Sequence, residues 1–150
     1  MPTRLRDFAT VMVAVAEPET TALAAAQLMR KHHVGALIVV DALEKVRPLG
    51  IVTDRDLVLA LMAEGLDPAI FTAGDIMSAP LVTASPEMDA MDAVRLMRSN
   101  RLRRLVITDD EGRLVGIVTM EDILEMLTRE LADLAAGVIG ARDREFEQRA

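Results

Sequence analysis

The sequence predicts an α/β (α+β) fold made of two tandem β-α-β-β-α units. Three observations predict it. The stretch GIVTDRDL at 50–57 returns as GIVTMEDI at 116–123, short apolar runs alternate with helix-like segments, and the composition suits layered packing. Apolar residues make up 51% of the 150 residues, and without Trp or Tyr any core consists largely of Leu, Val, Ile, Ala and Met.

The repeat extends well beyond these two stretches. When Pro18 is aligned with Pro86, LMRKHHVGALIVVD at 28–41 falls on LMRSNRLRRLVITD at 96–109. One copy alone would form a small sheet with one face uncovered, which is marginally stable. The duplication therefore predicts that the two copies pack face to face.

Each copy is expected to open with a short strand, at 11–16 and 81–84, that runs into a proline. An Ala- and Met-rich stretch with apolar spacing near 3.6 residues then predicts a helix. The apolar run ALIVV or LVIT is typical of a buried strand, and a polar turn leads to the next strand, LGIVT or LVGIVT. A final helix is expected at about 54–64 and about 120–134.

These elements divide the chain into a first unit with the N-terminal segment at 1–72, a second unit at 73–135 and a C-terminal tail at 136–150. Gly and Pro residues in 65–80 indicate a connector. The apolar pattern weakens in the tail, which predicts either a frayed helix or a segment that binds a partner.

Charge and composition exclude several classes of protein. The net charge of −7 argues against nucleic-acid binding, which needs clustered Lys and Arg. Without cysteine the chain has no disulfides and no thiolate metal site. It contains no signal-like leader and no apolar run of roughly 18 residues, so we expect a soluble, cytoplasmic protein that makes no membrane contact.

The two units resemble a known family. Each ends in G-hydrophobic-hydrophobic-T-x-x-D-hydrophobic, and DIMSAPLVTASP opens the second. Over about residues 3–132 the chain resembles a tandem pair of CBS domains, also called a Bateman module. The resemblance implies CBS units around a pseudo-two-fold axis with two clefts between them, and two modules that stack into a homodimer. It implies no obligatory cofactor, but a regulatory adenosyl ligand such as AMP, ADP, ATP, S-adenosylmethionine or a dinucleotide.

The resemblance also implies which residues bind. In the family the Asp takes the ribose hydroxyls, the Thr takes phosphate, and the start of the other copy's middle strand assists. One cleft would therefore use Thr53, Asp56, Leu102, Arg103 and Arg104. The other would use Thr119, Asp122, Val34, Gly35 and Ala36.

The two candidate clefts differ in charge. Only the first has a pair of arginines for charge-assisted hydrogen bonds to phosphate. Ser85 accompanies these arginines, whereas Glu17 would repel an anion in the other cleft. We therefore expect a phosphorylated adenosine in the first cleft, and a second cleft that is empty or holds a less anionic ligand. The alternative for Arg103 and Arg104 is a solvated helix end.

Thr-x-x-Asp also has a structural interpretation. A Thr followed three residues later by an acidic side chain, before an apolar helix, is typical of a capping box at a helix start. Capping and ligand binding are compatible because one local structure can do both. The intervening Arg55 and Glu121 are expected to be exposed.

The remaining features favour a regulatory protein over an enzyme. The sequence offers no Ser/His/Asp or Cys/His set and no phosphate-binding loop. His32 and His33 fit a helix end better than a metal site, because adjacent helical residues point in different directions. A chain that holds only the pair would signal to a separate, unidentified protein. The alternative function is a ligand-free module for dimerisation or docking.

Overall fold

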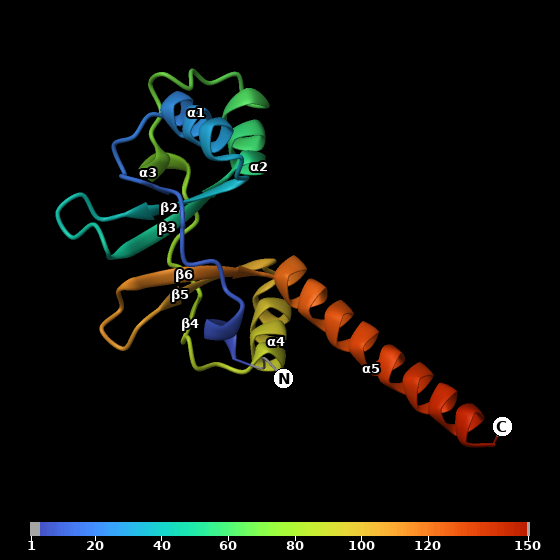
Figure 1. The fold of residues 1–150 in the computed structure, drawn as a ribbon. Coiled ribbons are helices and arrows are strands. Elements are labelled where there is room, and N and C mark those ends of the chain that lie inside the picture. The colour runs from blue at the N-terminus through green and yellow to red at the C-terminus, as the bar shows by residue number, and fades with distance from the viewer. Residues whose placement is uncertain (1–3, 150) are drawn as a thin grey trace.

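The computed structural model describes residues 4–149, which form two similar units of three strands each (Figure 1). The first unit contains β1 (Val15–Ala16), α1 (Ala22–His32), β2 (Ala36–Val40), β3 (Pro48–Thr53), α2 (Asp54–Asp56) and a π-helical turn, η2 (Leu57–Met62). The second contains β4 (Thr83–Ala84), α4 (Ala90–Asn100), β5 (Arg104–Thr108), β6 (Leu114–Thr119) and α5 (Met120–Arg149). Two short helices, η1 (Leu5–Asp7) and α3 (Ala73–Ile76), precede the units.

The two sheets have the same topology and register. In the order β1-β2-β3 the first pair is parallel and the second antiparallel, and β4-β5-β6 repeats this. Ile38 pairs with Ile51 in one sheet and Val106 with Ile117 in the other. The predicted fold class and tandem architecture are confirmed.

The two sheets cover each other. Ile38, Val40 and Val106 form one buried cluster, and Ile51 and Ile117 pack against it from the paired strands. Figure 1 shows β2 and β3 stacked over β5 and β6. Each unit also has its own cluster between sheet and helices. The central layer confirms that the sheets pack face to face.

Each opening segment lies on the opposite unit. Leu5 is 0% exposed inside the cluster of the second unit, and its N–H donates to Met88 O at 3.0 Å. Ala73 is 0% exposed inside the cluster of the first unit, and its N–H donates to Thr20 O at 2.7 Å. The units expected at 1–72 and 73–135 are therefore interlocked through their first residues.

Some boundaries differ from the sequence-based expectation. The strands expected at 11–16 and 81–84 are only two residues long. The helix expected to end near 134 continues to Arg149, so the tail at 136–149 is helical rather than a separate segment, and residue 150 lies outside the described residues. No proline interrupts it, and Ala, Arg, Glu and Gln support a helix despite two glycines.

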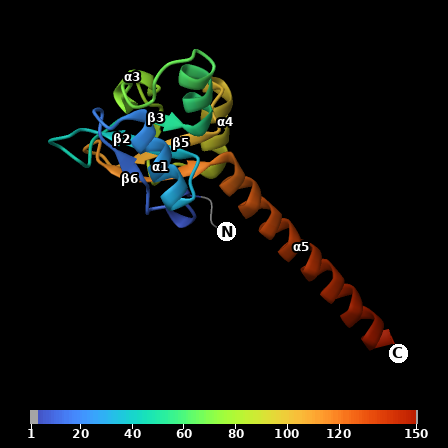
Figure 2. The ribbon, with the colours of Figure 1, turned by 90° about the horizontal axis from the view of Figure 1, so that it is seen from above.

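Long helix α5 projects from the body in both views (Figures 1 and 2). Within residues 4–149, none of the helices combines the length and the apolar character that a bilayer crossing requires.

The opening segments pass so close to the third strand of each sheet, β3 or β6, that only glycine fits beneath them. A Cβ on Gly116 would lie 2.5 Å from Thr10 O, and one on Gly50 would lie 2.5 Å from Met77 Sδ. Thr10 bridges Ile117, and Ser78 bridges Ile51, through pairs of backbone hydrogen bonds of 2.9–3.2 Å.

We expect Gly116→Ala to lower the free energy of unfolding by about 1–3 kcal/mol, because the new methyl group would displace backbone rather than a flexible side chain. The measurement is urea unfolding at fixed protein concentration. Gly140→Ala is the control: a Cβ there meets no atom within 4 Å, and alanine favours the helix. Equal stability of the two variants would contradict the close approach.

Candidate functional site

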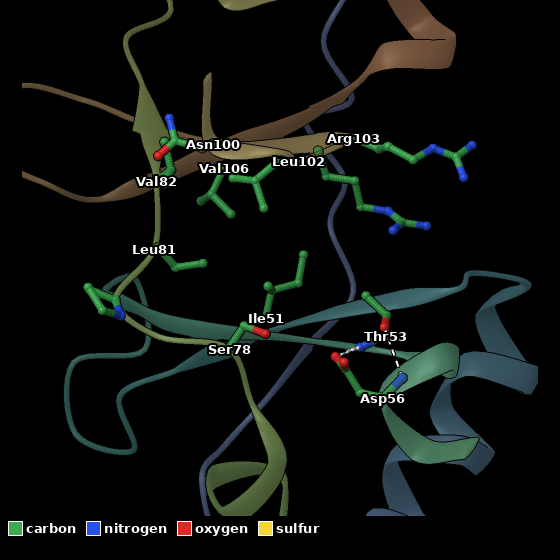
Figure 3. Close-up of a pocket in the computed structure, with 12 residues that line it drawn as sticks. Ile51, Thr53, Asp56, Ser78, Leu81, Val82, Asn100, Leu102, Arg103 and Val106 are labelled. Carbon is green, nitrogen blue, oxygen red and sulfur yellow. Dashed lines mark hydrogen bonds between the residues drawn. The ribbon is translucent and has the colours of Figure 1, made fainter. Parts of the chain in front are cut away.

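A pocket of about 240 Å³ opens between the two units at one edge of the stacked sheets (Figure 3). Both units and the connector contribute to its walls. The lining residues are Ile51, Thr53, Asp56, Ser78, Pro80, Leu81, Val82, Asn100, Leu102, Arg103, Arg104 and Val106. All five residues expected in the first cleft are therefore gathered in one cavity, whereas Ser85, expected beside them, is not among its lining residues.

Thr53 and Asp56 form a capping box at the start of α2. Asp56 N–H donates to Thr53 Oγ1 at 3.2 Å, and Thr53 N–H donates to Asp56 Oδ2 at 2.9 Å. Both side chains are half-buried and lie on the lower wall in Figure 3. The structural interpretation of Thr-x-x-Asp is confirmed. The box uses Oδ2 of Asp56, and within residues 4–149 Oδ1 has no hydrogen-bond partner.

A third Thr-x-x-Asp, which the sequence analysis did not single out, begins α3. Thr72 N–H donates to Asp75 Oδ2 at 2.9 Å, and Asp75 N–H donates to Thr72 Oγ1 at 3.3 Å. These side chains do not line the pocket. The spacing by itself therefore marks a helix start, and only its position beside the other unit makes Asp56 a candidate for binding.

Arg103 and Arg104 stand on the opposite wall at the start of β5. Helix α4 ends at Asn100, so both arginines lie beyond it. The Arg103 guanidinium is paired with the Glu121 carboxylate, although its side chain is 76% exposed. Arg104 is half-buried, and its side chain has no hydrogen bond or ion pair within residues 4–149. Of the two pocket arginines, Arg104 is therefore the one whose guanidinium group is not already paired with a carboxylate.

The pKa of Glu121 lies below its ordinary value of 4.5. The backbone N–H of Glu121 itself is the largest cause, and the hydrogen bond from Arg103 follows. The charges of Arg103 and Arg104 add to the lowering, and partial burial opposes it. Glu121 therefore keeps its negative charge at neutral pH and holds Arg103 toward the first turn of α5.

Between the two walls lies an apolar slot that the sequence analysis missed. Ile51 and Leu81 pack against the central cluster between the sheets. Ser78 is held there because its backbone bridges Ile51. Asn100 Nδ2 donates to Leu96 O at 2.9 Å. Ser78, Pro80, Leu81 and Val82 of this slot come from the DIMSAPLVTASP stretch, in which the sequence analysis singled out no ligand-binding residue except Ser85.

Ser85 lies outside the lining of this pocket. Its Oγ accepts a hydrogen bond from Glu87 N–H at 3.1 Å in the exposed turn before α4. A direct contact between Ser85 and a ligand in this pocket has no geometric support.

The residues expected in the second cleft are less closely gathered. Thr119 and Asp122 repeat the capping box, with hydrogen bonds of 2.9 and 3.0 Å. Val34 and Gly35, however, line an open hollow beside Asp54 of their own unit. Asp122 lines a different hollow with Asp7, Phe8, Glu125, Met126, Arg129 and Glu130. Ala36 is paired with Thr53 across β2 and β3.

The two histidines lie at a helix end, as expected. His32 is the last residue of α1, and His33 is its C-cap, with a left-handed backbone (φ 54°). Among residues 4–149, no three His, Asp or Glu side chains converge as metal ligands would.

The model of the CBS-domain family matches residues 5–63 and 73–129. The chain belongs to the CBS-domain family. The CBS domain-containing protein YhcV of Bacillus subtilis is 40% identical over 119 residues, which are 79% of this chain and 81% of YhcV. The uncharacterized protein MK0525 of Methanopyrus kandleri is 44% identical over 114 residues, and the match spans 76% of this chain but only 57% of MK0525.

Solved structures show the same CBS pair. CBSX2, crystallised in complex with AMP, is 28% identical, with a TM-score of 0.72 over 85% of this chain and 97% of CBSX2. The hexameric CBS-CP12 protein from bloom-forming cyanobacteria is 30% identical, with a TM-score of 0.72 over 81% of this chain and 69% of that protein. A CBS pair thus occurs in a nucleotide complex and in a large assembly.

Removing Arg103 should change the titration of Glu121. We expect Arg103→Ala to raise the Glu121 pKa, but only part of the way to 4.5, because the residue's own backbone N–H is the larger cause. Since the folded pKa is depressed, the stabilisation from these contacts is present at neutral pH and is lost as the pH falls through the folded pKa.

The measurement is an NMR titration of side-chain carboxyl carbons. Arg55→Ala is the matched control because Arg55 is exposed and does not contact Glu121. A Glu121 pKa that is unchanged in the Arg103→Ala variant would contradict the ion pair.

Proposed function

We propose that this CBS pair binds an adenine nucleotide, AMP, ADP or ATP, in the pocket between its units and regulates a partner protein through it. One observation carries the proposal. A single cavity joins a carboxylate with an unused oxygen, Asp56, to two arginines on the facing wall across an apolar slot.

The chemistry of the walls fits the parts of a nucleotide. Apolar side chains such as Ile51 and Leu102 suit the flat faces of adenine, and Ser78 offers a hydroxyl to its edge. A carboxylate can accept hydrogen bonds from both hydroxyls of a ribose. Guanidinium groups bind phosphate with paired, charge-assisted hydrogen bonds.

The charges favour a phosphorylated ligand over S-adenosylmethionine. The chain has a net charge of −7, so an anion is attracted only where cations gather. Arg104 has unused donors, whereas Arg103 must first leave Glu121. An exposed ion pair contributes only about 0–1 kcal/mol, so a phosphate can replace it. CBSX2 in complex with AMP supports this choice of ligand.

The same reasoning makes the module asymmetric. Val34, Gly35 and Ala36 occupy the positions equivalent to Leu102, Arg103 and Arg104, and none of them carries a charge. A ligand beside Thr119 and Asp122 would therefore be less anionic, or absent.

Regulation requires that the nucleotide bind one conformation or assembly better than another. Glu121 offers a route because it lies in the first turn of α5 and pairs with a pocket arginine. A phosphate that recruits Arg103 would free Glu121 and change the charge at the base of this helix. The alternative, a ligand-free docking module, is favoured by the long exposed part of α5.

Nucleotide at 100 times its dissociation constant should stabilise the protein by about 2.7 kcal/mol. For a chain of this size we expect the unfolding temperature to rise by about 5 to 10 °C. Arg104→Ala should remove most of the rise, because a hydrogen bond to a charged group contributes about 1.5–3 kcal/mol.

Arg98→Ala is the control, since Arg98 is exposed on α4 and does not line the pocket. The measurement is thermal unfolding with AMP, ADP, ATP and S-adenosylmethionine. An unfolding temperature that none of these ligands raises would favour the docking module instead.

Asp56 and Asp75 provide a matched pair, because both complete a capping box and only Asp56 lines the pocket. We expect Asp56→Ala and Asp75→Ala to lose similar stability, about 1 kcal/mol each. Only Asp56→Ala should weaken nucleotide binding, by tenfold or more in titration calorimetry. Equal affinities in the two variants would contradict the role of Asp56 in ribose binding.

A further inference from the structure

The exposed part of α5 carries an apolar seam that residues 4–149 leave largely open to solvent. The apolar residues of the seam follow one another at spacings of three and four positions in turn, which is the spacing of the a and d positions of a coiled coil. The seam consists of Leu124, Leu127, Leu131, Leu134, Val138 and Ala141. Leu131 is 67% exposed and Leu134 is 65% exposed, although their spacing is that of buried coiled-coil positions.

The seam lies where the helix has left the body. Of the 30 residues of α5, only Ile123 and Met126 are buried, both near its start. Figures 1 and 2 show the rest extending into solvent. A helix in water draws most of its stability from packing an apolar face. The helix therefore needs a partner along the seam.

The charges along α5 indicate what this partner is. Residues 120–134 contain five acidic residues and one arginine, a net charge of −4, whereas residues 135–149 contain three of each, a net charge of 0. A second copy in the same direction would set −4 against −4. A second copy in the opposite direction sets each acidic half against the half that has no net charge and carries three of the four arginines of α5.

The seam also fits itself in this direction. With two identical helices antiparallel, Leu131 of one copy can face Leu134 of the other. The same register sets Leu127 against Val138 and Leu124 against Ala141, so every layer is apolar. Of the four positions that flank the centre of the seam, Thr128, Ala135 and Gly137 are small or uncharged, and only Glu130 carries a charge. Such flanks let two helices approach closely.

A lipid surface is the other kind of partner that an amphipathic helix can have. Helices that lie on membranes usually carry Lys and Arg on the polar face. The first half of α5 is acidic instead and would be repelled by anionic lipid.

We propose that α5 pairs antiparallel with α5 of a second copy of this chain, through the seam from Leu124 to Ala141. The interface lies on the projecting helix, away from the nucleotide pocket, and does not depend on nucleotide binding.

The absence of native cysteine allows a direct test, because any disulfide reports the introduced residues. Two variants, Leu131→Cys and Leu134→Cys, are expressed separately and together with different tags, and then oxidised mildly. We expect a cross-linked dimer only from co-expression, since a disulfide needs Cβ atoms within about 4.5 Å. No cross-link in the mixture, or one formed by Leu134→Cys alone, would overturn the antiparallel pairing.

Sedimentation tests the seam independently. Leu131→Glu should lower the mass of the assembly at least twofold relative to wild type. Ala136→Glu adds the same charge on another side of α5 and should leave the mass unchanged, and circular dichroism verifies that both variants are folded. An unchanged mass for Leu131→Glu, or a monomeric wild type that binds phosphatidylserine vesicles, would overturn the proposal.

Discussion

The structure depends on one constraint, which is that each three-stranded sheet has an apolar face that is covered mainly by the other sheet. Ile38, Val40 and Val106 are buried at this shared face and belong to both units. Stacking the sheets fixes where their strand ends meet, and the pocket lies at that edge. The distance between the carboxylate wall and the arginine wall is therefore set by how the two sheets pack.

Duplication followed by divergence explains why one structural repeat offers two chemically different edges. The capping boxes are retained in both copies with nearly the same hydrogen bonds, because each starts a helix. The residues at the start of the middle strand differ between the copies: Arg103 and Arg104 in the second unit correspond to Gly35 and Ala36 in the first. The shared geometry is thus a matter of folding, and the two copies differ in the charges at the start of their middle strands.

The fold was readable from the sequence because the repeat presents every periodic pattern twice. Features that depend on contacts between segments far apart in the sequence could not be predicted. Leu5 and Ala73 give no local sign that they enter the opposite core. Ser78 and Leu81 lie in the stretch that opens the second unit, and nothing in its pattern shows that they reach the pocket. The expected end of α5, near residue 134, was too early. Beyond that point no residue of the helix is buried against the two units, so the apolar pattern weakens although the residues remain helical.

The exchange of opening segments also limits how such a protein can be divided. A fragment cut at the repeat boundary would keep the opening segment that packs into the other unit. It would lack the segment that packs into its own core, which would leave a cavity where Leu5 or Ala73 belongs. A single unit by itself would have to obtain this segment from another molecule. In the tandem chain the two units supply it to each other within one polypeptide, so the exchange does not depend on protein concentration.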